Sequence, residues 1–385
     1  MSATTSLSEN GAAAVKRGWR IALTANVKGV SFLPEDGPPD AGAEFDSLQT
    51  IAALTEAIEA DGHYVHLCQA DHTLPEALLN LRPHFVFNIA EGVGGDAREA
   101  QVPALCELLH IPYTGSRVLA NAIALDKVLT KRIWQTHGLP TAPFQSFTSV
   151  HEPLDPALTF PLFIKPSSEG TGMGMGPSSI VHDDAMLRRQ VAWVLETYRQ
   201  PALAEPFLPG REFTVGFIGN PGARTGRRRP WLYDNRGYHF FPVLELDSSQ
   251  SITPNVYGVA AKGLDIEATG APRYLCPADI PPALATELVR LTRLAAESLD
   301  VCDVGRVDFR LDAQGRPMLL EINTLPGLNP RVSDLCIMAA AEGMSYPTLI
   351  TEILYMAAER QRIPYRALLT PLVPADFSAE ASETA

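Results

Sequence analysis

Runs of apolar residues recur along the first third of the chain and alternate with amphipathic stretches. Short apolar runs bounded by turn residues predict strands, and apolar positions that repeat every three or four residues predict helices. Strands are expected at residues 21–27, 64–67 and 84–89, and helices at residues 47–60, 74–81 and 99–109. Strands that alternate with helices at this spacing are typical of a parallel α/β sheet. The pattern therefore predicts an N-terminal α/β unit over residues 18–122.

The rest of the chain is predicted to form two further units, at residues 123–208 and 209–365. Their expected elements are helices at 124–137, 184–198, 281–299 and 346–360, and strands at 162–165, 202–205 and 212–218. The two ends, residues 1–17 and 366–385, are rich in small and polar residues, and we expect them to be flexible tails.

A β-hairpin within residues 306–323 is predicted to carry polar side chains on one face. Side chains two apart on a strand share a face, so Arg306 points with Asp308, and Glu321 points with Asn323. Two carboxylates and a carboxamide crowded together repel one another unless a cation lies between them. Oxygen ligands of this kind suit Mg²⁺ that is shared with phosphates. The alternative is that this face is an ordinary solvated surface.

The turn sets the register of this hairpin. If Asp312 lies opposite Pro317, the loop between them has four residues, a length found in β-hairpins. Asp308 then lies opposite Glu321, which brings the two carboxylates together.

A glycine-rich segment, residues 166–176, follows the strand that ends at Lys165. Small residues let backbone N–H groups approach phosphate oxygens closely, and Lys165 would add a positive charge. The segment matches neither the GxxxxGK[ST] phosphate loop nor the GxGxxG dinucleotide loop. Taken alone it is either a flexible linker or a phosphate lid, and the lysine before it and the acidic hairpin after it favour the lid.

The interpretation of other charged residues depends on the acidic hairpin and the glycine-rich segment. Lys127 lies on a predicted helix, where a lysine is ordinarily solvated. Glu205 and Glu212 flank a turn between two strands, which suits a hinge that holds a nucleoside between apolar walls and carboxylates. The alternative for both glutamates is a surface position at the ends of strands.

The composition describes a globular protein of more than one domain, with 385 residues, 46% of them hydrophobic and 19% charged. The 31 basic and 44 acidic side chains give a formal net charge of −13. This charge argues against broad binding to nucleic acid or to anionic membranes. The run at residues 227–229 is a local exception, either an exposed loop or a contact for phosphate or a partner.

The five cysteines show no CxxC spacing, and no Cys or His cluster has zinc-ligand spacing. Buried thiols in a reducing cytoplasm fit this pattern. Residues 1–14 lack the apolar core of a signal peptide, and no apolar run reaches transmembrane length. We therefore expect a cytoplasmic protein with neither a membrane nor a nucleic-acid partner.

Together, these motifs resemble the ATP-grasp superfamily and, within it, the D-alanine–D-alanine ligase family. The resemblance covers roughly residues 85–360, and more weakly 18–84; it is densest at residues 99–109, 111–116, 125–127, 211–215 and 321–327. It implies an α/β class with an ATP-grasp fold, in which α+β lobes follow an N-terminal parallel α/β domain. The central lobe would be residues 123–208, and the C-terminal lobe with its metal site residues 209–365.

The resemblance also implies ATP and a pair of Mg²⁺ or Mn²⁺ ions as cofactors. The implied phosphate contacts are Lys127, Lys165 and the loop residues Gly170, Thr171 and Gly172. Those around the nucleoside are Glu205, Pro206, Phe207 and Leu208 for the adenine and Glu212 for the ribose. The implied metal ligands are Asp308, Glu321 and Asn323, and Arg306 would face the reacting carboxylate.

The implied reaction is that of a carboxylate–amine ligase acting on small amino acids. A carboxylate attacks the γ-phosphate of ATP, and an amine then displaces phosphate from the acyl phosphate, which leaves ADP and phosphate. Family members are often homodimers. The alternatives are the same fold acting on other amino acids or a peptide, a hydroxyl acceptor, and a nucleotide-binding regulator without turnover.

The chain departs from the family pattern where the amino acids are selected. Glu44 is our candidate for the first substrate's amino group, and the alternative is an acidic residue favoured by a helix dipole. Ser333 is the candidate for a substrate carboxylate, with Arg331 as the alternative. Residues 88–92, with Arg98 and Glu99, also line the expected cleft and are candidates for recognising a substrate other than D-alanine.

The third departure concerns a tyrosine. The family commonly has a Lys-Tyr pair before the segment that starts at Arg273. Lys262 matches the lysine, but Gly263 stands at the tyrosine position. Tyr257, from the same loop, is a candidate replacement.

Overall fold

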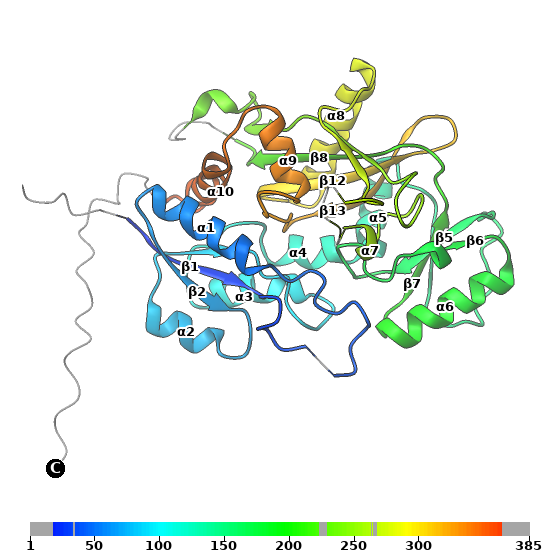
Figure 1. The fold of residues 1–385 in the computed structure, drawn as a ribbon, viewed down its shortest axis with the longest axis horizontal. Helices are drawn as coiled ribbons and strands as arrows, with labels where there is room; N and C mark the ends of the chain where they lie inside the picture. Colours follow the sequence, from blue (N-terminus) through cyan, green and yellow to red (C-terminus); the bar gives the residue numbers. More distant parts are fainter. Residues whose placement is uncertain (1–17, 34, 223–228, 263, 265–267, 364–385) are drawn as a thin grey trace, which may run out of the picture.

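The computed structural model describes residues 18–33, 35–222, 229–262, 264 and 268–363. Three sheets follow one another along the chain. Figure 1 shows the first, with β1 and β2, at the left, the one containing β8 and β12 in the upper middle, and the one containing β5 to β7 at the right. The predicted tails at 1–17 and 366–385, Gly263 and residues 227–228 lie outside the described residues.

The first sheet confirms the predicted parallel α/β unit. Its strands are parallel in the order β2-β1-β3. The side chain of Ser47 accepts a hydrogen bond from the N–H of Thr50 and so caps the first helix where the pattern predicts its start. The elements are β1 (Arg20–Ala25), α1 (Leu48–Ala60), β2 (Tyr64–Gln69), α2 (Leu74–Leu81), β3 (Phe85–Asn88), the 3-10 turn η1 (Arg98–Ala100) and α3 (Gln101–Leu108).

The helix expected at residues 124–137 is divided in two. α4 (Val118–Leu125) ends before Asp126, and α5 (Lys127–Thr136) begins after it. Asp126 is extended, and its side chain accepts a hydrogen bond from the N–H of Leu129. The prediction of one helix is wrong at its start because this aspartate caps a new helix rather than continuing the old one.

The second sheet is antiparallel, with the strand order β4-β7-β5-β6. One helix, α6, packs its apolar face on this sheet, and the two form a hydrophobic cluster of their own. The elements are β4 (Gln145–Phe147), β5 (Leu162–Pro166), the 3-10 turn η2 (Pro177–Ser179), β6 (Ile180–Val181), α6 (Asp184–Tyr198) and β7 (Ala202–Pro206).

The third sheet has the order β11-β10-β8-β12-β13, and β9 also pairs with β8. Helix α8 packs on β8, β12 and β13 in one apolar cluster. The strands are β8 (Glu212–Gly219), β9 (Tyr238–Phe240), β10 (Leu244–Asp247), β11 (Arg273–Leu275), β12 (Asp303–Leu311) and β13 (Pro317–Asn323). The helices are η3 (Pro230–Leu232), α7 (Val259–Lys262), α8 (Pro282–Ser298), α9 (Asp334–Ala341) and α10 (Tyr346–Arg360).

The β12–β13 hairpin has the predicted carboxylate pair but not the predicted turn. Asp308 lies opposite Glu321, as expected. However, Pro317 pairs with Leu311 and not with Asp312, so the four-residue loop is wrong.

A β-bulge accounts for both observations. Phe309 pairs with Leu319, whereas Asp308 pairs with Glu321, which leaves Leu320 as the extra residue. The one-residue change of register at the turn is reversed by the extra residue at the bulge, so Asp308 still lies opposite Glu321. Leu319 is buried in the core, whereas Leu320 lines the same pocket as Glu321.

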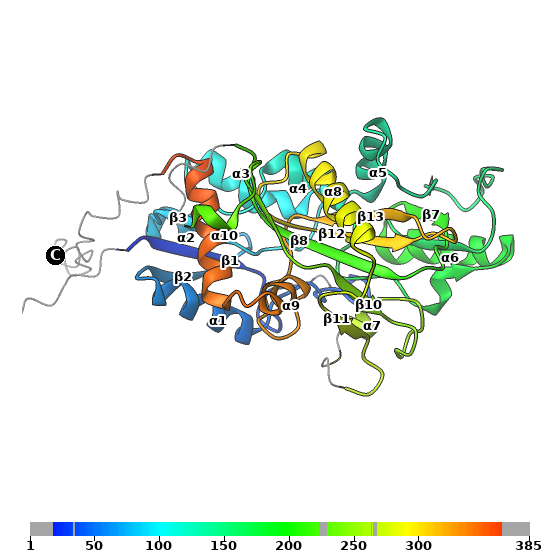
Figure 2. The ribbon, with the colours of Figure 1, turned by 90° about the horizontal axis from the view of Figure 1, so that it is seen from above.

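Helix α10, near the end of the described chain, packs against elements from its beginning. It packs on α1, and one apolar cluster contains residues of β1, α1, α9 and α10. The hydroxyl of Tyr355 on α10 lies 3.1 Å from Nε2 of His63, and Trp19 stacks on that histidine. Figure 2 shows α10 crossing beside β1 and α1, at the far end of the molecule from α6. No helix in the described ranges is both long and apolar enough to span a membrane.

We expect Leu354→Ala on α10 to lower the free energy of unfolding by about 2–5 kcal/mol, because truncation leaves a cavity in a close-packed core. Leu354 is 0% exposed and belongs to the cluster shared with β1. Urea denaturation followed by circular dichroism measures the effect. The control is Leu108→Ala, whose side chain is 75% exposed and should shift the midpoint little. Equal shifts for both variants would contradict the shared core.

Candidate active site

Two pockets adjoin one another and share their central residues. The narrow pocket, of about 80 Å³, lies between β5, β7 and the β12–β13 hairpin. The wide pocket, of about 250 Å³, extends from the hairpin to the loops of the first sheet. The residues that line both pockets are Lys127, Glu169, Tyr257, Lys262 and Glu321. A molecule in one pocket would therefore meet a molecule in the other beside these residues, four of which are charged.

All residues predicted to bind ATP line one of these pockets. The narrow pocket contains Lys127, Lys165, Gly172, Glu205, Pro206, Phe207, Leu208 and Glu212. Gly170 and Thr171, from the same glycine-rich segment, line the wide pocket.

A buried ion triad adjoins the narrow pocket, which two of its members, Lys165 and Glu205, line. Glu205 accepts Lys165 at 2.7 Å and Lys131 at 2.8 Å. Burial alone would raise the pKa of Glu205, but the two ammonium groups outweigh it and lower the pKa to about 2. Its carboxylate is therefore charged and paired with both lysines. Sequence reasoning missed Lys131, although its place one helical turn after Lys127 puts both on one face of α5.

An arginine missed by the sequence analysis, Arg310, lies over the ring of Phe207, one of the residues predicted to border the adenine. The guanidinium of Arg310 is 4.9 Å from the centre of the Phe207 ring and 3.4 Å from the Glu212 carboxylate. Burial raises the pKa of Glu212, and the charge of Arg310 opposes that shift. Arg310 lies two residues after Asp308 on one strand, which is the signal that could have identified it.

The carboxylates of the hairpin are held by cations of the chain. Arg306 forms a two-pronged contact with Asp308, with both N–O distances 2.9 Å, and lies 3.4 Å from Asp334. Glu321 lies 3.2 Å from the Nζ of Lys127. Burial opposes the charged form of Glu321, yet neighbouring lysines, Lys127 first, lower its pKa. The polar face is therefore buried and internally paired, not a solvated surface.

The predicted metal ligands lie together. Asp308 pairs with Glu321 across the strands, and Asn323 donates Nδ2 to Asp308 at 3.1 Å. Within the described residues, no group of three or more His, Cys, Asp or Glu has the arrangement of a metal site. Mg²⁺ that is shared with phosphates needs only one or two carboxylates. The oxygen donors of this set fit such an ion.

The glycine-rich segment adopts a backbone that few other residues tolerate. Thr171, Gly172 and Gly174 all have positive φ, the left-handed region that favours glycine. A Cβ on Gly172 would lie 2.7 Å from the Cα of Gly258. The segment is thus packed against the loop before α7, and Lys127 donates to the backbone oxygen of Glu169 at its start.

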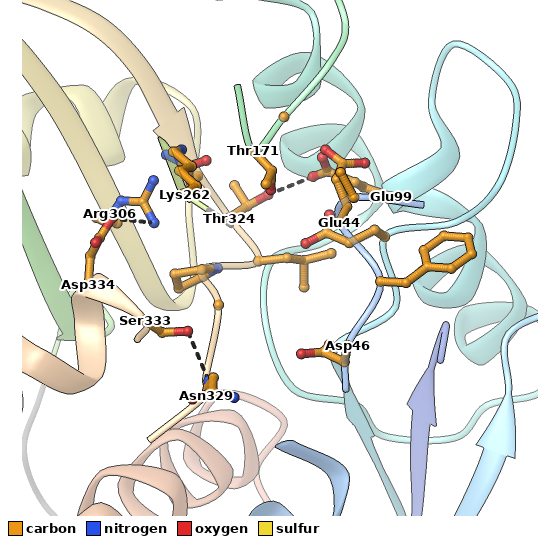
Figure 3. Close-up of a pocket in the computed structure, with 18 of the residues that line it drawn as sticks. Glu44, Asp46, Glu99, Thr171, Lys262, Arg306, Thr324, Asn329, Ser333 and Asp334 are labelled. Carbon is orange, nitrogen blue, oxygen red and sulfur yellow. Dashed lines mark hydrogen bonds and ion pairs between the residues drawn. The ribbon is translucent and has the colours of Figure 1, made fainter. Parts of the chain in front are cut away.

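The residues predicted to be catalytic all line the wide pocket. Figure 3 shows Arg306 and Lys262 on one side and Glu44 and Glu99 on the other, with Thr171 between them. Ser333 also lines the pocket, where its Oγ accepts the N–H of Asn329. The alternative to Ser333, Arg331, is exposed and is absent from the lining of both pockets.

Arg98 ties the first sheet's loops to the glycine-rich segment. Its guanidinium contacts Glu44 at 2.9 Å, Glu169 at 3.0 Å and the backbone oxygen of Ser168 at 2.8 Å. A Cβ on Gly170 would lie 2.3 Å from Oε1 of Glu44. Glu44 therefore lies directly beneath the segment predicted to close over ATP.

Tyr257 lies where the two pockets meet. Its hydroxyl is 2.9 Å from that of Tyr274, and Lys262 lies 4.5 Å above its ring. Its backbone oxygen would be 2.8 Å from a Cβ on Gly172. It thus touches both the wide pocket and the glycine-rich segment.

Comparisons with known proteins show which family the chain is similar to. The family model described as "D-ala D-ala ligase C-terminus" matches residues 133–355. A D-alanine–D-alanine ligase of Bordetella avium is 33% identical over 324 residues, which cover 83% of this chain and 93% of that protein. An uncharacterized protein of Sinorhizobium fredii, y4sG, is 33% identical over 80% of this chain and 87% of its own.

A solved structure has the same fold. The D-alanine–D-alanine ligase of Bacillus anthracis in complex with ATP superposes with a TM-score of 0.67 at 20% identity, covering 90% of this chain and 99% of that one. The fold is therefore the predicted ATP-grasp fold, and the protein is an ATP-dependent ligase that forms C–N bonds. The chain belongs to the D-alanine–D-alanine ligase family.

We expect Glu205→Gln to destabilise the protein by about 3–5 kcal/mol, because it leaves two buried lysines without a counter-charge. The pKa of Glu205 in the folded protein, about 2, lies below its ordinary value of 4.5. Its stabilising charge is therefore fully present above that ordinary value and is lost as the pH falls from there towards 2. The difference in melting temperature between wild type and variant should shrink over that range.

The matched control is Glu287→Gln, since Glu287 and Arg290 form an ion pair whose side chains are 39% and 47% exposed. Exposed ion pairs contribute about 0–1 kcal/mol, so its shift should be small. A difference between wild type and Glu205→Gln that does not change with pH would show that charge is not the cause.

Proposed function

We propose that this protein joins two amino-acid substrates through an amide bond, with the carboxylate of the first activated by ATP as an acyl phosphate. The observation that carries the proposal is that the narrow and wide pockets adjoin at Lys127, Lys262 and Glu321. A terminal phosphate that enters from one pocket and a carboxylate that enters from the other are both anionic. The cations at the junction offset their repulsion.

In the narrow pocket, Phe207 and Leu208 supply apolar contact for a base, and Glu212 supplies an acceptor for a ribose hydroxyl. Lys127 and Lys165 contact the phosphates. Both lysines are held by carboxylates, so they are oriented before the nucleotide binds. Asp308, Glu321 and Asn323 would hold Mg²⁺, which neutralises phosphate charge when bound.

The chemistry has two steps. An oxygen of the first substrate's carboxylate attacks the γ-phosphorus, and the bond to ADP breaks. The amine of the second substrate then attacks the acyl carbon, phosphate leaves, and the amine proton is lost. Arg306, fixed between Asp308 and Asp334, stabilises charge on the reacting carboxylate, while Gly170 and Thr171 exclude water from the acyl phosphate.

The substrates are proposed as amino acids, since relatives at this similarity are D-alanine–D-alanine ligases. Tyr257 is proposed to take the place of the tyrosine that the family commonly has at the position of Gly263. Its contacts with the wide pocket and with the glycine-rich segment support this assignment. D-Alanine is the reference substrate, and the acidic lining of the wide pocket favours testing other amino acids beside it.

We expect phosphate release from ATP and Mg²⁺ that depends on added amino acids and is lost in Asp308→Ala, because that change removes a ligand and the anchor of Arg306. The assay screens D- and L-amino acids singly and in pairs. Release with D-alanine alone assigns the activity of the named relatives. Release only with another pair keeps the reaction and changes the substrates, and no release with any pair contradicts the proposal.

We expect Arg306→Lys to lower kcat by about 10²–10³-fold with little change in ATP affinity, because a lysine cannot reproduce the two-pronged contact with Asp308. Steady-state kinetics with saturating ATP, and titration with a fluorescent ATP analogue, measure the two quantities. Arg290→Lys is the control, since Arg290 forms an exposed pair with Glu287 on α8. Equal loss of ATP affinity would assign Arg306 to nucleotide binding instead.

A further inference from the structure

A long strap of the first unit reaches across to the glycine-rich segment. It consists of residues 28–33 and 35–45 and lies between β1 and α1. Its base is closed, because the N–H of Lys28 donates to the backbone oxygen of Asp46 and the N–H of Asp46 to that of Asn26, both at 2.9 Å. Figure 1 shows this blue loop extending from the end of β1 towards α6. Ordered loops of more than about 15 residues without helices or strands are usually functional.

Asp40 of the strap binds the glycine-rich segment and α6 at the same time. Its Oδ2 accepts the backbone N–H of Gly174 at 2.9 Å, and its two oxygens lie 2.8 and 2.9 Å from the hydroxyl of Tyr198, at the end of α6. Burial, and then the hydrogen bond and charge of Asp40, raise the pKa of Tyr198, so its hydroxyl keeps the proton that it donates. One carboxylate therefore joins the strap to two elements of the central lobe.

This contact differs from the neighbouring hydrogen bonds of the glycine-rich segment, which are internal. The N–H groups of Met173 and Met175 donate to the backbone oxygens of Gly170 and Gly172. The N–H of Gly174, between them, donates to the strap instead. The turn can therefore form by itself, and the bond to Asp40 fixes where it lies relative to the strap.

The strap and the segment run side by side in opposite directions. Asp40 contacts Gly174, whereas Glu44, later in the strap, lies against Gly170, earlier in the segment. Beside these points, the strap and residues 197–201 line a cleft of about 810 Å³. Because this cleft interrupts the packing between the strap and the central lobe, the attachment depends on polar contacts such as those of Asp40.

We propose that Asp40 is a positioning residue of the ligase, which holds the glycine-rich segment closed over the terminal phosphate of ATP. The inference rests on the proposed function, in which Gly170 and Thr171 exclude water from the acyl phosphate. Asp40 lines neither the narrow nor the wide pocket, so it acts through the segment. Without its bond to Gly174, the closed position of the segment is less stable and water gains access.

The variants that test this role are Asp40→Ala, which removes both contacts, and Asp40→Leu, which keeps the length of the side chain without an acceptor. Asp40→Asn retains one acceptor oxygen and is the conservative variant. The matched control is Asp36→Ala on the same strap, since Asp36 pairs with Arg199 and their side chains are 68% and 67% exposed. Melting temperatures show that each variant folds, and two disruptive variants keep the test valid if one does not.

Hydrogen exchange, measured at single residues by mass spectrometry with Mg²⁺ and the ATP analogue AMPPNP bound, reports on the segment without turnover. The N–H groups of Met173 and Met175 keep their internal acceptors in every variant, so faster exchange there means that the whole segment opens. We expect about tenfold faster exchange in Asp40→Ala and Asp40→Leu, because a hydrogen bond to a charged group changes an equilibrium constant by about tenfold or more.

Calorimetric titration with AMPPNP and with ADP, each with Mg²⁺, gives a second readout, since ADP lacks the phosphate that the segment covers. We expect the preference for AMPPNP over ADP to fall about tenfold in the two disruptive variants. It should be largely restored in Asp40→Asn and unchanged in Asp36→Ala. A purely structural contribution of Asp40 would lower the melting temperature without changing this preference.

The outcomes separate the two proposals. Exchange and nucleotide preference like those of the wild type in both Asp40→Ala and Asp40→Leu would overturn the role of Asp40, and so would equal changes in Asp36→Ala. Neither readout requires turnover. Expected effects of both Asp40 variants, in an enzyme that releases no phosphate with any pair of amino acids, would contradict the ligase function and leave the closure of the segment by Asp40 in place.

Discussion

The pairing of buried charges is the constraint on which the rest of this structure depends. The hairpin of β12 and β13 brings Asp308 and Glu321 face to face, which is unfavourable unless cations lie beside them. Arg306 and Lys127 supply those cations from the same strand and from α5. Because each buried ion loses several kcal/mol of hydration, the pairs persist only with close contacts and further hydrogen bonds. The fold of the third sheet and the start of α5 are therefore linked through charge as well as through apolar packing.

Much of the fold could be predicted because it follows from local periodicity. Helices α2, α6 and α10 have the predicted bounds, since their apolar residues repeat at helical spacing and their ends carry capping or turn residues. The β-bulge at Leu320 could not be predicted, because an extra residue in one strand leaves no mark on the alternation of a short sequence. The division of α4 from α5 could have been predicted, since an aspartate followed by a new amphipathic run is a signal for the start of a helix.

The candidate site was predictable only where one segment carries several functional groups. Lys165 with its glycine-rich segment and the hairpin from Arg306 to Asn323 are such segments. Lys131 and Arg310 each share a face with a predicted residue, but that spacing does not reveal their distant partners Glu205 and Glu212. Tyr274 has no such local signal, because its partner Tyr257 is brought to it by the fold. The family resemblance assigned roles to matched positions but could not show that the Glu205 carboxylate is held between two lysines.

The two halves of the site differ in how completely their charges are balanced. In the narrow pocket, four carboxylates each contact a lysine or an arginine; they are Glu205, Glu212, Asp308 and Glu321. The negative charges on that side are therefore balanced by cations of the chain. In the wide pocket, Glu44 pairs with Arg98, whereas Asp46, Glu91 and Glu99 form no ion pair with a lysine or an arginine of the described chain. A buried carboxylate without a cation is tolerated only if it is protonated or if a ligand supplies the charge. The residues that the sequence analysis proposes for selecting the amino acids therefore lie in the same pocket as the carboxylates without an ion pair.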